Sequence, residues 1–480
     1  MRKWLPLVAI CLGAFILLVD VTIVNVALPS MASDLHASFS SLQWVMDMYA
    51  LALAALLLAA GSLADLFGHR RLYAIGLAVF ALASLAAALS PNAAALITAR
   101  AVQGVGGAAM FATSAGLVAA TYQGRDRGMA FGVWGAVNGA AAALGPVLGG
   151  LLTQGIGWQA IFLVNLPIAV VAVVLTLRVL PAGRRGAGRL DVPGAVTFTV
   201  AAAALTYALM RGGDHGWTDS LTVIAFVLAG VAAAAFVVAE LMTSHPMLDL
   251  SLLRRPTFSG LLGGALLYQA GAFGGLVYVS LWLQNVLGLS PIRGGLALMP
   301  LAGAAFVAAA VAGKHSHRFA PALPIGGGLV LIGAGAAVLW QSVSAGSHAT
   351  SLIAGLAVIG VGVGLATPVL VSTAVDAVPA NRAGMAGGAV NTFRQLGMSL
   401  GIALFGSVFT SRMRHVVSHG GGVRAAYASG LDRIFLASAL AALVGGVLVF
   451  LTVHRPTPGG DAGAGHRPAA APEDAAVSAG

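Results

Sequence analysis

Residues 5–28, LPLVAICLGAFILLVDVTIVNVAL, decide the fold, because they form an apolar segment long enough to cross a membrane as one helix. The carboxylate of Asp20 interrupts this segment, and the amide of Asn25 follows it. At 1.5 Å per residue, Asp20 lies roughly 12 Å inside the Leu28 end of such a helix. A charge at that depth is costly unless it is paired, protonated or hydrated, so the default interpretation of Asp20 is functional.

The composition predicts a protein that crosses a membrane many times. Of the 480 residues, 59% are hydrophobic and 8% are charged, and no soluble domain with that balance would stay in solution. The net charge of +10 does not indicate nucleic acid as a partner, because the basic residues are scattered through short loops. The lipid bilayer is the expected environment, and no nucleic acid is expected to bind.

Several function classes lack their sequence signatures. The single cysteine, Cys11, rules out a disulfide framework, and none of the 11 histidines lies clearly within a predicted span, so we expect no metal site and no cofactor. There is no G-x4-G-K-[ST] phosphate loop, which excludes ATP-driven transport within this chain. No nucleophile–base arrangement or H-E-x-x-H motif suggests an enzyme, and we expect none.

Apolar segments of about 20 residues, the length that a helix needs to cross a bilayer, occur fourteen times. They are long runs without period-two alternation, which excludes an outer-membrane barrel. The predicted fold is therefore an all-α membrane protein with 14 transmembrane helices, arranged as two six-helix bundles plus two inserted helices. The predicted spans are 5–28, 42–64, 72–90, 93–119, 129–152, 159–180, 191–211, 220–241, 257–284, 291–313, 322–342, 350–373, 384–411 and 431–453.

Breaks in composition divide the chain into four parts. A basic, flexible stretch at 181–190 ends the first six-helix block, and a second break follows at 243–256. The predicted parts are an N-terminal six-helix bundle at 1–185, two inserted transmembrane helices at 186–245, a C-terminal six-helix bundle at 246–456 and a disordered cytoplasmic tail at 457–480. Lys and Arg concentrate in loops on the side of the N-terminus, which predicts that both termini are cytoplasmic.

Arg100 lies within a span at a depth similar to that of Asp20, roughly 12 Å. A guanidinium there would stabilise the carboxylate, or occupy the site when Asp20 is protonated. The structural alternatives are a static ion pair or two groups that never meet. Asp47 is the one other acidic residue that we expect to share the function of Asp20 and Arg100.

Further polar groups lie within the spans, and Arg394, near mid-membrane, needs a counter-charge or water. Most such groups in membrane helices form interhelical hydrogen bonds, which is the alternative to a role as substrate ligands. The candidate substrate-cavity residues are Asn25, Gln103, Asn138, Gln269, Asn391 and Arg394.

The loop G-S-L-A-D-L-F-G-H-R-R at 61–71 is a second candidate feature. Glycine permits close packing and a tight turn, and Asp65 can cap a helix or meet an arginine of the next cytoplasmic loop. We prefer a charge lock that holds one conformation to an ordinary basic loop. Its predicted residues are Gly61, Asp65, Gly68, Arg70, Arg71, Arg125 and Arg127.

The span at 129–152 carries glycines at helical spacing and a Gly-Pro pair, G-P-x-x-G-G. Small faces allow close helix contact in lipid, and proline bends the helix. Generic packing is the alternative in a chain with 64 glycines. The residues singled out are Gly139, Gly145, Pro146, Gly149 and Gly150.

Taken together, these motifs resemble the major facilitator superfamily, and in particular its fourteen-span drug:proton antiporter branch, from Trp4 to about Arg455. The similarity lies in V-D-V-T-I-V-N-V-A-L-P at 19–29, the 61–71 loop, R-x-x-Q-G from Arg100, and G-P-x-x-G-G, whose first family glycine is Ala141 here. W-x-x-I-F-x-x-N-x-P at 158–167, L-Q-N-V-L-G-L-S-P at 283–291 and R-Q-L-G at 394–397 are also similar.

The resemblance implies alternating access by two rocking bundles, with inward-moving protons driving export of drugs, antibiotics or other amphiphilic small molecules across the bacterial cytoplasmic membrane. It implies that Asp20 exchanges a proton, that Arg100 assists, and that the 61–71 loop with the Gly-Pro span biases the conformation. A monomer is expected. An exporter dedicated to one endogenous metabolite and an uptake carrier of the same fold are the alternatives.

Overall fold

The computed structural model describes residues 2–182, 191–243, 246–315 and 319–453, and these form helices joined by short loops without a strand. The predicted tail at 457–480 lies outside the described residues. The first helices are α1 Leu5–Asp34, α2 Phe39–Phe67, α3 His69–Ala88, α4 Ala93–Thr121, α5 Gly124–Gly155, α6 Ala160–Leu163, α7 Asn165–Val179, α8 Val192–His215 and α9 Ser220–Met242. The remainder are α10 Pro256–Phe273, α11 Leu276–Asn285, α12 Pro291–Ala297, α13 Met299–His315, α14 Ala322–Ser342, α15 Ile353–Asp376, α16 Ala383–Ser418 and α17 Val423–Thr452.

The all-helical membrane fold is confirmed, whereas the count of fourteen spans is not. Within the described residues, 12 helices are long and apolar enough to cross a membrane, or up to 13 if the bent α5 counts as one span. The remaining predicted span, 291–313, is divided into α12 and the shorter apolar helix α13. The division lies just before Pro300, which has no amide hydrogen to bond the carbonyl of Leu296.

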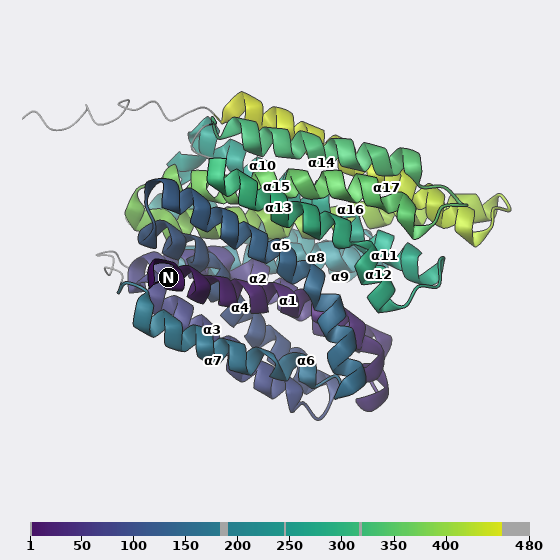
Figure 1. Cartoon of the computed structure of the whole chain (residues 1–480), viewed down its shortest axis with the longest axis horizontal. Coiled ribbons are helices and arrows are strands. Elements are labelled where there is room, and N and C mark those ends of the chain that lie inside the picture. The colour runs from purple at the N-terminus through teal and green to yellow at the C-terminus, as the bar shows by residue number, and fades with distance from the viewer. Residues whose placement is uncertain (1, 183–190, 244–245, 316–318, 454–480) are drawn as a thin grey trace, which may run out of the picture.

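The helices run side by side along the length of the molecule and form two groups (Figure 1). Helices α1–α7 make up one group, which we call the first half, and α10–α17 make up the second half. The inserted pair, α8 and α9, packs on itself, and α8 also packs against α2 and α16. Trp44 of α2 stacks on Tyr207 of α8, and Trp217 donates a hydrogen bond to Ser407 of α16, so the pair contacts both halves.

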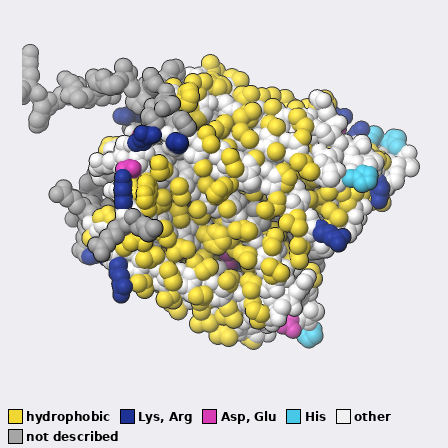
Figure 2. Space-filling model, viewed as in Figure 1, with side chains coloured by type: hydrophobic (Ala, Val, Ile, Leu, Met, Phe, Trp, Pro, Cys, Tyr) yellow, Lys and Arg dark blue, Asp and Glu magenta, His cyan; other side chains and the backbone are white. Residues whose placement is uncertain are grey.

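The surface has an apolar belt between two polar ends (Figure 2). Large hydrophobic side chains are exposed along the belt, for example Val223, Val227 and Val231 on one face of α9. On the face shown, Lys and Arg side chains lie at both ends of the molecule, and the visible histidines lie at the end opposite the N-terminus (Figure 2). An exposed apolar band of this kind is the surface that lipid covers.

Glycine contacts join the two halves at the end of the molecule that carries the N-terminus. Gly132 of α5 lies against Gly313 of α13, and a Cβ at Gly132 would come within 2.7 Å of the Gly313 Cα. Gly61 of α2 lies against the backbone of Gly384 in α16 in the same way. Helices approach this closely only where side chains are missing, so these glycines determine how tightly this end is closed.

We expect Gly132→Ala to destabilise the closed arrangement by about 1–3 kcal/mol, because the added methyl group has no space between α5 and α13. Elsewhere in a helix, glycine to alanine is stabilising by roughly 0.5–1 kcal/mol. The matched control is Gly303→Ala in α13, since a Cβ at Gly303 meets nothing within 4 Å. Thermal unfolding of the purified variants checks this, and equal melting temperatures for both would contradict the close contact.

Candidate functional site

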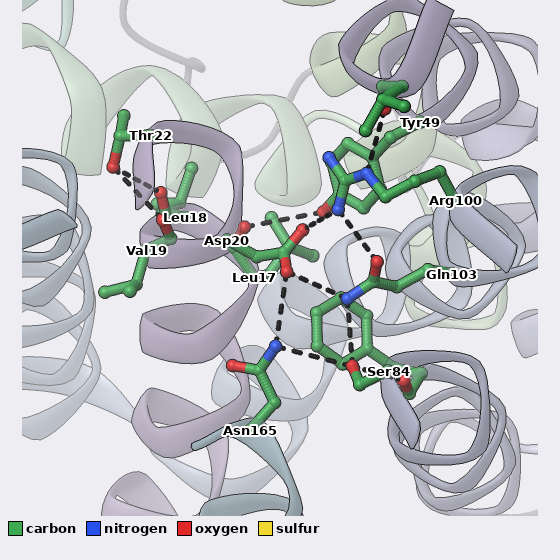
Figure 3. Close-up of polar contacts among 12 residues, drawn as sticks. Leu17, Leu18, Val19, Asp20, Thr22, Tyr49, Ser84, Arg100, Gln103 and Asn165 are labelled. Carbon is green, nitrogen blue, oxygen red and sulfur yellow. Dashed lines mark hydrogen bonds and ion pairs between the residues drawn. The ribbon is translucent and has the colours of Figure 1, made fainter. Parts of the chain in front are cut away.

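The structure brings Asp20 and Arg100 into direct contact in the middle of the first half (Figure 3). Asp20 is 0% exposed on α1 and Arg100 is 1% exposed on α4, and the Nη1 group of Arg100 donates to the Asp20 Oδ2 atom. The alternative that these groups never meet is therefore wrong. Each charge supplies the counter-ion that the other needs inside an apolar bundle.

Neutral polar groups satisfy the remaining carboxylate oxygen of Asp20. Gln103 Nε2 donates to Oδ1 at 2.8 Å, and Asn165 Nδ2 donates to the same atom at 3.2 Å (Figure 3). Ser84 Oγ accepts from Gln103 at 2.9 Å and from Asn165 at 3.4 Å, while it donates to the carbonyl of Phe80. The carboxylate is thus held by α1, α3, α4 and α7 together.

Arg100 has partners besides Asp20. Its Nε donates to the carbonyl of Val45 at 3.0 Å, and its Nη1 also donates to Gln103 Oε1 at 2.8 Å. The guanidinium lies 4.3 Å from the centroid of the Tyr49 ring, a cation–π contact. The guanidinium of Arg100 therefore has two neutral acceptors and an aromatic ring beside it, in addition to the Asp20 carboxylate.

Sequence reasoning missed Ser84, Tyr49 and Asn165. A signal existed for Asn165, which is the asparagine of the W-x-x-I-F-x-x-N-x-P stretch and an amide within a span. Ser84 had none, because a serine in an apolar helix commonly bonds its own preceding turn. Asp47 is half-buried on α2, and its role stays a prediction.

A second polar cluster lies in the second half. Arg394 of α16 donates from Nε to Gln269 Oε1 at 3.2 Å and from Nη1 to Asn391 Oδ1 at 3.3 Å. Its guanidinium lies 5.6 Å from the Tyr268 ring centroid and 6.0 Å from that of Phe111, which belongs to α4 of the first half. Three of the six predicted cavity residues are thus brought together here.

The other predicted cavity residues are dispersed. Gln103 belongs to the Asp20 cluster. Asn138 is buried on α5, and neither of its amide atoms has a hydrogen-bond partner among the described residues. Asn25 is part of α1, but its side chain lies outside the described part of the structure.

Asp65 caps a helix of the second half. Its Oδ1 and Oδ2 atoms accept hydrogen bonds from the backbone amides of Gly384 and Met385, each at 2.7 Å, at the start of α16. A carboxylate is favoured there because the first amides of a helix have no partner within it. The expected partners of Asp65, Arg125 and Arg127, are not its partners in this structure.

A separate ion pair also joins the halves. Arg127 of α5 pairs with Asp376 at the end of α15 at 2.8 Å, whereas Arg125 is exposed. Among the other predicted lock residues, Gly68 adopts φ 95°, a conformation that favours glycine, and it links α2 to α3. Arg70 donates to the carbonyl of Leu177 in α7, and Arg71 is exposed.

The Gly-Pro stretch of α5 bends and contacts both halves. The segments Gly124–Ala141 and Leu144–Gly155 meet at 43°, near the carbonyl that Pro146 leaves without its helical partner. A Cβ at Gly145 would overlap Thr22 of α1, and one at Gly149 would come 2.7 Å from the carbonyl of Ile23. Gly150 faces Ile292 of α12, whereas Gly139 has ordinary spacing to Ala305.

The comparisons with known proteins agree with this architecture. The family model described as "Major Facilitator Superfamily" matches residues 10–402. The chain is 38% identical to the tetracenomycin C resistance and export protein of Streptomyces glaucescens, over 86% of this chain and 77% of that protein. It is 37% identical to the multidrug resistance protein Stp of Mycobacterium tuberculosis, over 85% of this chain and 76% of that protein.

A solved structure supports the fold. The human organic anion transporter MFSD10 (TETRAN) is similar with a TM-score of 0.67 at 16% sequence identity, covering 93% of this chain and 99% of that chain. At that identity the likeness concerns the fold alone. With the matched family model and the sequence relatives, it shows that the chain belongs to the major facilitator superfamily.

Proposed function

We propose that this protein is a proton-coupled antiporter that exports drugs, antibiotics or other amphiphilic small molecules across the bacterial cytoplasmic membrane. The observation that carries the proposal is the buried Asp20–Arg100 cluster, a carboxylate within membrane-spanning helices that has a defined set of partners. The names of the relatives, which speak of resistance and export, support export as the direction.

In this proposal Asp20 exchanges a proton between the two sides of the membrane. Protonation removes the charge that attracts Arg100, while Val45 and Gln103 still accept from the guanidinium. The neutral carboxyl keeps Asn165 as a neighbour. Because side chains from α1, α2, α3, α4 and α7 meet at this point, the protonation state alters the packing of much of the first half.

Alternating access requires the halves to separate at the end that carries the N-terminus. The contacts that would have to open are the Asp65 bonds to α16, the Arg127–Asp376 pair and the glycine crossings. All of them involve backbone atoms or single charged pairs rather than large apolar surfaces. Such contacts make a closed state that opens at modest cost.

The proposed topology has fourteen crossings, with the bent α5 and the α12–α13 pair each counted as one. Both termini would then lie in the cytoplasm, where the closed end described above would face. We propose a monomer as the transporting unit. A dedicated exporter of one compound is the second candidate, favoured by the single antibiotic in the name of the tetracenomycin C relative.

We expect Asp20→Asn to abolish proton-driven export while the protein still inserts in the membrane, because an amide side chain does not take up or release a proton near neutral pH. The measurement is pH-gradient-driven ethidium transport in inverted vesicles, with the amount of protein determined in parallel. Asp34→Asn is the control, since among the described residues the exposed Asp34 carboxylate accepts hydrogen bonds from Trp158 and Gln159 and lies outside the Asp20 cluster. Asp20→Glu, which keeps the carboxyl, separates loss of function from loss of folding. Full transport by Asp20→Asn would refute the proposal.

We expect Asp65→Asn to favour opening at the end that carries the N-terminus, because asparagine retains one acceptor oxygen for two helix amides. A hydrogen bond to a charged group contributes roughly 1.5–3 kcal/mol, so the opening equilibrium should shift by about tenfold or more. In a Cys11→Ser background, a cysteine at buried Ala383 should react faster with a membrane-impermeant maleimide.

The control for this experiment is Asp126→Asn, since Asp126 pairs with Lys3 at the same end but within the first half. Its labelling rate should equal that of the parent protein. Equal rates for Asp65→Asn and Asp126→Asn would show that the cap on α16 does not hold the halves together.

A further inference from the structure

Arg394 differs from Arg100 in having no carboxylate among its described partners. Its hydrogen bonds go to the neutral oxygens of Gln269 and Asn391, and its flanking contacts are aromatic rings. Arg394 lies eleven residues into α16, which places it about 16 Å along that helix from Ala383. A guanidinium at such a depth without a counter-charge is expensive, and such a residue indicates a functional site.

The acidic residues of the described second half do not supply the missing charge. Asp249 pairs with Arg382 at 2.9 Å, and Asp376 pairs with Arg127. Asp432 lies near the start of α17, at the opposite end of the molecule from Ala383. In the first half Asp20 is paired with Arg100, so its carboxylate is not the counter-charge of Arg394.

The side chain of Arg394 is less enclosed than that of Arg100. Arg100 is 1% exposed, whereas Arg394 is only partly buried. Beside it, the Nδ2 group of Asn391 is a buried donor without a partner among the described residues. Since the Oδ1 atom of Asn391 already accepts from Arg394, reorienting the amide would cost that bond. A ligand that brings an acceptor would satisfy both groups at once.

The surroundings of the Arg394 guanidinium suit a ligand with aromatic rings. Phe111 of the first half lies beneath the guanidinium and stacks on Trp134 at 6.1 Å between ring centroids. The centroid of the Tyr268 ring lies 5.6 Å from the same guanidinium. The indole nitrogen of Trp134 has no hydrogen-bond partner among the described residues, and it is a donor. Aromatic side chains from both halves therefore lie near the Arg394 guanidinium.

We infer that Arg394, with Asn391 and Gln269, forms an anion subsite and that the preferred substrates are aromatic compounds bearing a carboxylate or phenolate. This inference rests on the proposed export function and specifies its substrate class. The anionic group would bind the guanidinium, where a charge-assisted contact is strong because water is scarce. The apolar rings would lie along Phe111 and Tyr268.

The inference has an electrical consequence. The exit of an anion and the entry of a proton each make the inside of the membrane more positive, so their charge movements add. Export of a monovalent cation against one proton moves no net charge. For an anionic substrate, a membrane potential negative inside therefore drives export even without a pH gradient.

The test compares two dyes with the same ring system, fluorescein as the anion and rhodamine 123 as the cation, binding to the purified full chain in detergent. We expect fluorescein to bind about tenfold more tightly or better. Arg394→Gln should lose about tenfold in fluorescein affinity. Arg394→Lys should retain most of it, and the exposed Arg255→Gln serves as the control. Equal affinities for the two dyes, or an unchanged preference in Arg394→Gln, would overturn the inference.

A second variant guards against misfolding of Arg394→Gln. Asn391→Asp keeps the shape of the side chain and places a carboxylate next to the guanidinium, 3.3 Å away at present. This internal counter-ion should remove fluorescein binding and raise the melting temperature. Undiminished fluorescein binding by Asn391→Asp would count against the subsite as directly as an unchanged Arg394→Gln.

The binding assay needs no gradient, so it is independent of the proposed antiport. Fluorescein binding through Arg394 without pH-driven transport would refute the antiport and leave the subsite intact. Transport that depends on the pH gradient, together with a fluorescein affinity that Arg394→Gln leaves unchanged, would refute the subsite and leave the antiport intact.

Discussion

The ion pair between Asp20 and Arg100 is the interaction on which the rest of the structure depends, because each charge offsets much of the cost of burying the other among apolar helices. Burying such a pair is compensated only when further hydrogen bonds satisfy the remaining polar atoms. Gln103 and Asn165 do this for the carboxylate, and the carbonyl of Val45 does it for the guanidinium. The pair therefore fixes the relative positions of helices that otherwise contact one another mainly through apolar side chains.

The two halves use charge differently. The first half balances its buried charge internally, whereas the second half presents Arg394 towards neutral oxygens and aromatic rings. The halves meet through the Asp65 cap on α16 and through glycine crossings, where the backbone of one helix lies directly against the backbone of the other. A protein built in this way has a buried ion pair in one half, an arginine with neutral partners in the other, and charged and backbone contacts between the halves.

Much of this could be predicted from the sequence, and the failures have physical reasons. The fixed rise of a helix placed Asp20 and Arg100 at one depth, although it could not say that they face each other. The sequence left open whether Asp65 caps a helix or meets an arginine, and it could not identify α16 as the capped helix because backbone amides of a distant helix leave no side-chain signature. The α12–α13 break was missed because hydropathy over 291–313 is continuous, whereas Pro300 interrupts the hydrogen bonds. Ser84 was missed because its hydroxyl also satisfies its own helix.

The central claim is that Asp20 gains and loses a proton inside the membrane-spanning helices. Infrared difference spectroscopy of the reconstituted protein tests this directly, because a protonated carboxyl has a C=O stretching band that a carboxylate lacks. A titration of the wild-type protein should show such a band appear as the pH falls, and the same component should be missing from Asp20→Asn while the bands of other acids remain. Identical titrations of the two proteins would contradict the account.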